Sequence, residues 1–93
     1  MLLFNLSVKS RDGVLYAGQV SSISSYNKKG KFDVLPQHAN FISLIQKSLV
    51  IRDNRGQTRE INVNNGLMRV KKDIVEVYIG IEALGGFSGA VKD

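Results

Sequence analysis

Pro36 and His38, the single proline and the single histidine of the chain, lie two positions apart and are the first place to look for chemistry. A histidine can act as a general base toward a hydroxyl nucleophile, which would make this stretch part of a small hydrolase. The serines near His38 in the sequence do not follow the pattern of a nucleophile elbow, however. The hydrolase is therefore a hypothesis that depends on one residue.

Metal and cofactor sites lack their usual ligands. The chain has no cysteine, and its aspartates are scattered without ligand spacing. No glycine-rich phosphate loop of a common type occurs. Glu60, Glu76 and Glu82 are expected at strand positions whose side chains point outward. Nothing in the sequence supports catalysis by paired carboxylates. The sequence predicts no catalytic residue, no metal and no cofactor.

A net charge of +5 raises the possibility of an anionic partner. Basic residues cluster only at Lys28-Lys29-Gly30-Lys31 and at Lys71-Lys72, where turns are expected. Tyr26 precedes the first cluster, and small β-domains bind single-stranded nucleic acid with aromatic rings set among basic residues. Solvated turns, with tyrosines covering sheet edges, explain the same pattern. A small basic β-barrel that binds single-stranded nucleic acid is the alternative function.

These residues must be positioned by strands. Residues 2–9 alternate apolar and polar side chains, which is the period of a half-buried strand. Asp12-Gly13 is a tight-turn signal, and a change of parity near Ser21-Ser22 indicates a bulge. Leu35 precedes a proline and is pushed toward extended geometry, so a rigid corner begins there. We expect short strands over residues 2–9, 14–25, 31–34, 41–45, 49–52, 58–63, 67–70 and 74–79, with turns that include 46–48 and 64–66.

Strands at this near-regular spacing, without a 3.6-residue period, predict an all-β sandwich or barrel. With 93 residues the chain makes one domain. We expect that domain over residues 1–83 and a flexible, glycine-rich C-terminal tail over 84–93. The first residues alternate like a strand of mature protein and not like a signal peptide. No apolar run approaches the roughly 20 residues of a membrane span.

Three segments carry a family resemblance. Residues 30–45, GKFDVLPQHANFISLI, resemble the pattern Gly-Glu-Phe-Gly-Val-Leu-Pro-Gly-His-Ala-Pro-Leu-Ile of the epsilon subunit of F-type ATP synthases. Residues 12–20, DGVLYAGQV, are similar to that family's Glu-Gly-…-Phe-Ser-Gly-Glu-Val strand. Residues 64–83 are similar to its Ser-Gly-Gly-Phe-Leu-Glu-Val…Val-Thr-Val-Leu-Ala-Asp segment. The three are collinear, at family-like spacing, across residues 2–83.

The resemblance implies a flattened β-sandwich of about eight to ten short strands. It also implies a non-catalytic subunit of the central stalk, which links the gamma subunit to the c-subunit ring in proton-driven ATP synthesis. Such a subunit is soluble when isolated and lies peripherally at the cytoplasmic face of the inner (plasma) membrane, without direct insertion. The ring-facing loop would comprise Lys31, Phe32, Asp33, Pro36, Gln37, His38 and Asn40.

Several positions depart from the family pattern. Lys31 stands where the pattern has an acidic residue, and Gln37 and Asp33 stand where it has glycine. An acidic ring loop would make Lys31 a compensating change. Residues 84–93 are too short and too rich in glycine to form the C-terminal helix pair of many members. An inhibitory role through such helices is therefore not expected of this chain.

Overall fold

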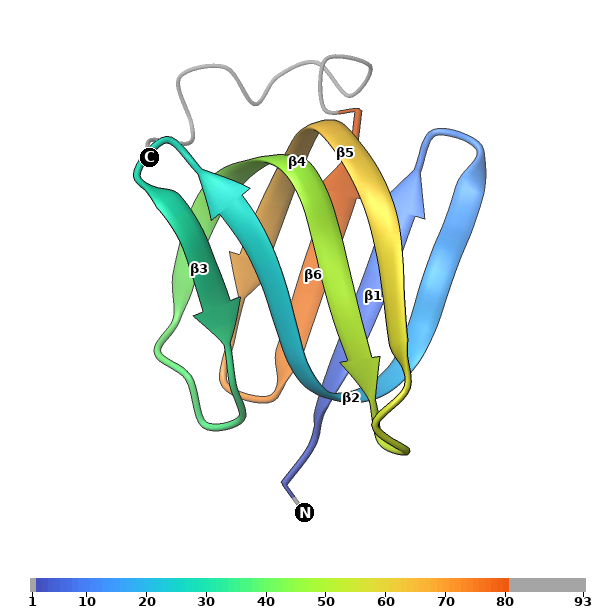
Figure 1. The fold of residues 1–93 in the computed structure, drawn as a ribbon, viewed down its shortest axis with the longest axis vertical. Coiled ribbons are helices and arrows are strands. Elements are labelled where there is room, and N and C mark those ends of the chain that lie inside the picture. The colour runs from blue at the N-terminus through green and yellow to red at the C-terminus, as the bar shows by residue number, and fades with distance from the viewer. Residues whose placement is uncertain (1, 81–93) are drawn as a thin grey trace.

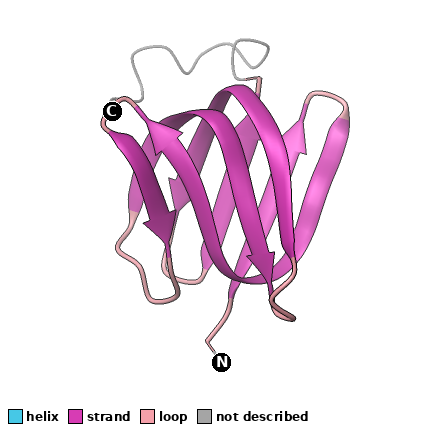
Figure 2. Cartoon of the chain, viewed as in Figure 1, coloured by secondary structure: helices cyan, strands magenta, loops and turns pink. Residues whose placement is uncertain are grey.

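The computed structural model describes residues 2–80, and every regular element in that range is a strand (Figure 2). This confirms the predicted all-β class. The strands are β1 (Phe4–Ser10), β2 (Gly13–Asn27), β3 (Gly30–Val34), β4 (Phe41–Asp53), β5 (Thr58–Val70) and β6 (Ile74–Ile79). The predicted C-terminal tail lies outside the described residues. No helix capable of crossing a membrane occurs within residues 2–80.

The strands form one sheet that closes on itself. Their order is β1-β6-β5-β4-β2-β3. β1 also pairs with β2, so β1, β6, β5, β4 and β2 form a closed ring of strands. β3 remains outside this closed set and pairs with β2 alone. β1 and β6 are parallel, and the other pairs are antiparallel. Long strands bend from one layer to the other, which gives the barrel the two-layered shape of a sandwich (Figure 1).

There are six strands between residues 2 and 80, fewer than the eight to ten expected, because two predicted turns do not form. Residues 46–48 lie inside β4 and residues 64–66 lie inside β5. The β4–β5 pairing changes register between Ile45 and Lys47 and then continues. A bulge inserts a residue and bends a strand without ending its pairing. The prediction of turns at these two places was wrong for that reason.

The core lies between the two layers. Phe4, Leu6 and Val8 of β1 and Val75 and Val77 of β6 are buried, as their alternation predicts. The four remaining strands, β2 to β5, also contribute buried side chains, so the cluster is continuous through the barrel. These side chains are Val20, Ile23, Val34, Ile45, Leu49, Ile51, Val63, Met68 and Val70. The core therefore joins all six strands of the described residues in one cluster.

A buried side-chain hydrogen bond joins two neighbouring strands of the barrel. The hydroxyl of Ser25, which is fully buried, donates to the carbonyl oxygen of Ser48 at 2.8 Å. It joins β2 to the bent part of β4. A buried hydroxyl without a partner would cost free energy, so this bond makes serine tolerable at an inward position.

Candidate functional site

The corner predicted at Pro36 connects β3 to β4 as a loop over residues 35–40, with a turn at Pro36 and Gln37. Gln37 has a φ of 63°, in the left-handed region. A non-glycine residue there costs roughly 1–2 kcal/mol, which explains why the family pattern has glycine at this position. This chain thus carries a strained residue at a position where the family pattern has glycine.

His38 fastens the corner to two other elements. Its Nδ1 lies 2.6 Å from the carbonyl oxygen of Leu35, and its Nε2 lies 2.5 Å from the carbonyl oxygen of Lys71. The ring also meets Phe4 of β1 edge-on, with centroids 5.1 Å apart. A carbonyl only accepts, so a ring nitrogen donates a hydrogen bond here only when it carries the proton, which depends on the tautomer. Both nitrogens are occupied by backbone oxygens, and within residues 2–80 no hydroxyl contacts them.

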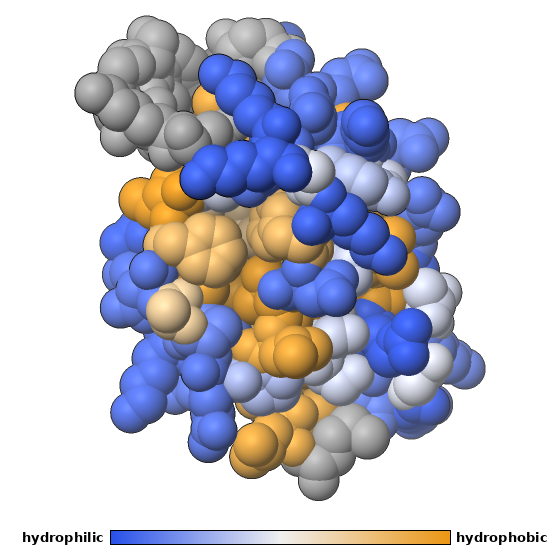
Figure 3. All heavy atoms as spheres, turned by 60° about the vertical axis from the view of Figure 1, so that its left-hand side comes forward, coloured by the Kyte–Doolittle hydropathy of each residue, from blue (hydrophilic) through white to orange (hydrophobic). Residues whose placement is uncertain are grey.

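An apolar surface lies beside this corner. Phe32 of β3 and Phe41 of β4 meet edge-to-face with centroids 6.1 Å apart, and Phe32 also packs against the core. Leu35 and Ile42, on either side, are 57% and 47% exposed. Figure 3 shows apolar side chains gathered on this side of the molecule, with hydrophilic ones around them. We call Phe32, Leu35, Phe41 and Ile42 the apolar surface; exposed patches of this kind are typical of protein interaction sites.

Lys31 lies at the other end of β3. It pairs with Tyr26 next to the Asn27–Gly30 turn, whereas Pro36 lies beyond the opposite end of the strand (Figure 1). At about 3.3 Å per residue, roughly 15 Å separates Lys31 from Pro36. The predicted ring-facing residues therefore do not form one cluster.

The remaining predicted residues divide between these two ends. Phe32 belongs to the apolar surface. Asp33 accepts a hydrogen bond from the hydroxyl of Ser24 at 2.5 Å, which ties its carboxylate to the neighbouring strand. Gln37 and Asn40 are exposed, and both lie in the corner with His38. The corner and the apolar surface are thus neighbours, while Lys31 belongs to the turn at the far end.

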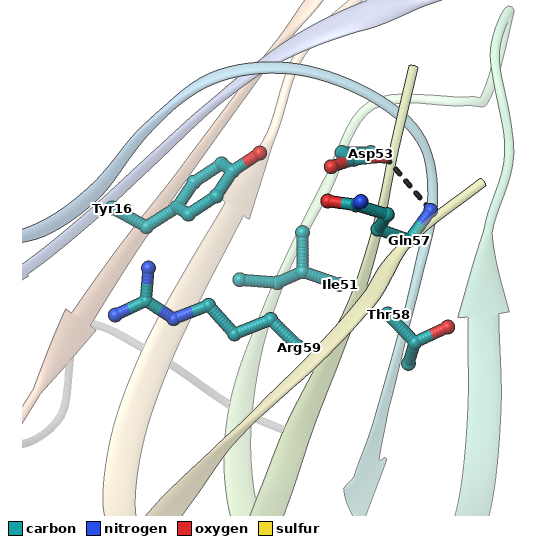
Figure 4. Close-up of a pocket in the computed structure, with 6 residues that line it drawn as sticks. All are labelled: Tyr16, Ile51, Asp53, Gln57, Thr58 and Arg59. Carbon is teal, nitrogen blue, oxygen red and sulfur yellow. Dashed lines mark hydrogen bonds between the residues drawn. The ribbon is translucent and has the colours of Figure 1, made fainter. Parts of the chain in front are cut away.

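A hollow of about 340 Å³ lies between Tyr16, Ile51, Asp53, Gln57, Thr58 and Arg59 (Figure 4). The guanidinium of Arg59 lies 5.9 Å from the centre of the Tyr16 ring. Asp53 Oδ1 accepts from the backbone N–H groups of Arg55 and Gln57 at 2.8 and 2.9 Å. The one carboxylate of this hollow therefore holds the β4–β5 turn. Nothing in the sequence pointed to this hollow, because its members meet only through strand pairing.

The outer face of the sheet carries the one perturbed titratable group among the described residues. Burial, and then the neighbouring Glu76 carboxylate, raise the pKa of Tyr78 above 10.0. The Tyr78 hydroxyl donates to Glu76 at 3.2 Å, and Arg69 lies 3.8 Å from the other oxygen of that carboxylate. No group of three or more His, Cys, Asp or Glu side chains within residues 2–80 could hold a metal ion.

The fold places residues 2–80 in the class of small all-β domains with a closed sheet. The edge strand β3 and the two ends of this barrel carry exposed surfaces. A sequence model described as "ATP synthase, Delta/Epsilon chain, beta-sandwich domain" matches residues 3–80. The chain belongs to this family.

Curated relatives carry the same description. An ATP synthase epsilon chain of Helicobacter pylori (strain HPAG1) is 34% identical over 77 residues, which cover 83% of this chain and 63% of that protein. An ATP synthase epsilon chain of Wolinella succinogenes is 32% identical over 90 residues, or 95% of this chain and 69% of that protein. The match therefore spans less than two thirds of the Helicobacter protein and slightly more than two thirds of the Wolinella protein.

Solved structures share the fold. A chain in the cryo-EM structure of the Euglena gracilis mitochondrial ATP synthase matches with a TM-score of 0.78 and 16% identity, over 85% of this chain and 51% of that one. A chain in the central stalk/c-ring structure of the Tetrahymena thermophila mitochondrial ATP synthase matches with a TM-score of 0.68 and 11% identity, over 97% and 78%. At these identities the likeness concerns the fold alone.

Proposed function

We propose that this chain is a non-catalytic central-stalk subunit of an F-type ATP synthase, which links the gamma subunit to the c-ring in proton-driven ATP synthesis. Membership of the delta/epsilon family over residues 3–80 supports this role. The observation that carries it is the apolar surface. A domain that only had to fold would gain by burying Leu35 and Ile42, which are instead held in water beside a rigid corner.

The apolar surface is the side that we assign to gamma. Phe32 packs against the core and touches Phe41, so a partner bound there would extend the core beyond the edge strand β3. Burying apolar area contributes about 25 cal/mol per Å² to association. The corner residues Gln37, His38 and Asn40 would form the polar rim of that contact, since interfaces surround an apolar centre with polar groups.

The opposite end of β3 is the side that we assign to the c-ring. Lys31 and the Asn27–Gly30 turn are polar and exposed there. This divides the predicted ring-facing residues, because Lys31 and the corner lie at opposite ends of β3. In this arrangement the subunit is a peripheral member of a membrane-bound complex at the cytoplasmic face of the inner membrane.

Co-expression with the gamma subunit of the same synthase tests the proposal. The unchanged chain is expected to co-purify with gamma. Leu35→Glu places a charge on the apolar surface and is expected to weaken the complex about 10-fold or more, because burying an unpaired carboxylate is costly. Val14→Glu is the matched control, since Val14 is 62% exposed on β2, away from that surface. Failure of the unchanged chain to bind gamma, or equal loss in both variants, would contradict the proposal.

A further inference from the structure

The end of the barrel that carries the β2–β3 turn holds a group of four lysines. Tyr26 of β2 pairs with Lys31 of β3 on one side and with Gln46 of β4 on the other. The ammonium group of Lys47 lies 5.2 Å from the centre of the Tyr26 ring. Lys28 and Lys29 form the turn between β2 and β3. We call Lys28, Lys29, Lys31 and Lys47 the basic surface.

No carboxylate neutralises these lysines within residues 2–80. The segments 25–32, 43–50 and 61–68, which pair at this end, contain no aspartate and no glutamate. None of the four lysines forms an ion pair in the described part of the chain, where Arg69–Glu76 is the pair present. An uncompensated group of like charges creates a positive potential that attracts anions. The charge of this surface is therefore available to a partner.

The basic surface is also held in a fixed shape. The side-chain oxygen of Asn27 accepts from the backbone N–H of Lys29 at 2.8 Å, and its amide nitrogen lies 3.3 Å from the Ser43 hydroxyl of β4. Lys47 has a φ of 71°, in the left-handed region that favours glycine. Strained residues persist where the surrounding structure fixes them, and they concentrate at functional positions. Here the bulge of β4 holds Lys47 over Tyr26, beside the other lysines.

We propose that the basic surface binds an acidic segment of a partner protein. The inference rests on the proposed function, in which this end faces the ring, and it names the chemistry of that contact: aspartate or glutamate side chains presented by a loop.

A single-stranded nucleic acid is a poorer fit to the same lysines. Binding of that kind needs an open aromatic face on which a base stacks. The Tyr26 ring is half-buried, and the Lys47 ammonium group occupies the space over it. Carboxylates need no such face, since they pair with ammonium groups directly. The geometry therefore favours an acidic protein segment.

The test is a titration of the full 93-residue chain, followed by NMR of its backbone amides, with a hexaglutamate peptide as the probe. The peptide is expected to shift the amides of Lys28, Lys29, Lys31 and Lys47, and the binding should weaken as salt increases. The double variant Lys28→Gln/Lys29→Gln should weaken it about 5-fold, as expected for the loss of two exposed charge pairs. Lys71→Gln/Lys72→Gln is the matched control, with the same loss of charge at the opposite end of the barrel.

Equal weakening by the two double variants would overturn the inference, because binding would then follow net charge alone. Tighter binding of a ten-residue deoxythymidine oligonucleotide at the same amides would also overturn it. The result is separable from the proposed function. If the chain binds gamma but the peptide does not reach the basic surface, only this inference fails. If the peptide binds there but gamma does not bind the chain, only the central-stalk role fails.

Discussion

Among the glycines of the described strands, Gly66, inside β5, leaves the least room for a β-carbon. A β-carbon added to Gly66 would lie 2.9 Å from Cγ1 and 3.2 Å from Cδ1 of Ile45, and 3.1 Å from Cγ1 of Val63. Ile45 and Val63 are 3% and 1% exposed, so neither can move into solvent. We therefore predict that Gly66→Ala destabilises the protein.

Two effects of opposite sign set the magnitude. Replacing glycine by alanine reduces the entropy of the unfolded chain and stabilises by about 0.4–1 kcal/mol where the backbone conformation allows alanine. Forcing a methyl group into a packed core costs about 1–3 kcal/mol. The packing cost is larger, and the expected net loss is about 1–2 kcal/mol of the free energy of unfolding. For a domain of this size that lowers Tm by roughly 4–16 °C.

Gly18→Ala is the matched control. A β-carbon at Gly18 would lie 3.6 Å from the nearest atom of Tyr16, an ordinary contact, so this variant is expected to be unchanged or slightly more stable. Urea unfolding followed by circular dichroism gives both values. In a double-mutant cycle with Ile45→Ala, which removes two of the three close contacts, the cost of Gly66→Ala should shrink by about 1 kcal/mol. Gly66→Ala as stable as Gly18→Ala would refute the reasoning.

Three further predictions concern the corner and the outer face. His38→Ala removes the contacts of the ring with the carbonyl oxygens of Leu35 and Lys71 and with Phe4, and should lower the free energy of unfolding by about 1–2 kcal/mol. A variant as stable as the original in urea unfolding would show that these contacts contribute nothing. Gln37→Gly relieves a left-handed φ of 63° and should raise the free energy of unfolding by up to about 1 kcal/mol, and with it Tm. A lower Tm would count against strain at the corner. Tyr78 should ionise above pH 10.0 in an NMR titration of its ring, and Glu76→Gln should lower its pKa. Because the unfolded tyrosine loses its proton first, stability is unaffected below pH 10.0 and falls as the pH rises beyond it, and Tyr78→Phe should remove that part of the fall.

The candidate site was predictable only in part. Pro36 and His38 marked the corner correctly, and the lysines of the β2–β3 turn were visible as a cluster. The sequence did not reveal Lys47 as their neighbour, because the β4–β2 pairing and a bulge bring it over Tyr26. The apolar surface was equally hidden, since Phe32 and Phe41 belong to different strands and face each other only after the corner has formed.

By itself the sequence determined the all-β class, the turns at Asp12-Gly13 and Asn27–Gly30, and the family pattern around the corner. Local periodicity and turn residues act within a few positions, so they specify which side of each strand faces the core. Only the tertiary structure decided whether residues 46–48 and 64–66 end a strand or bend it, because that depends on pairing between β4 and β5. It also decided that Lys31 and His38 lie at opposite ends of β3, since an extended strand separates residues that are close in sequence.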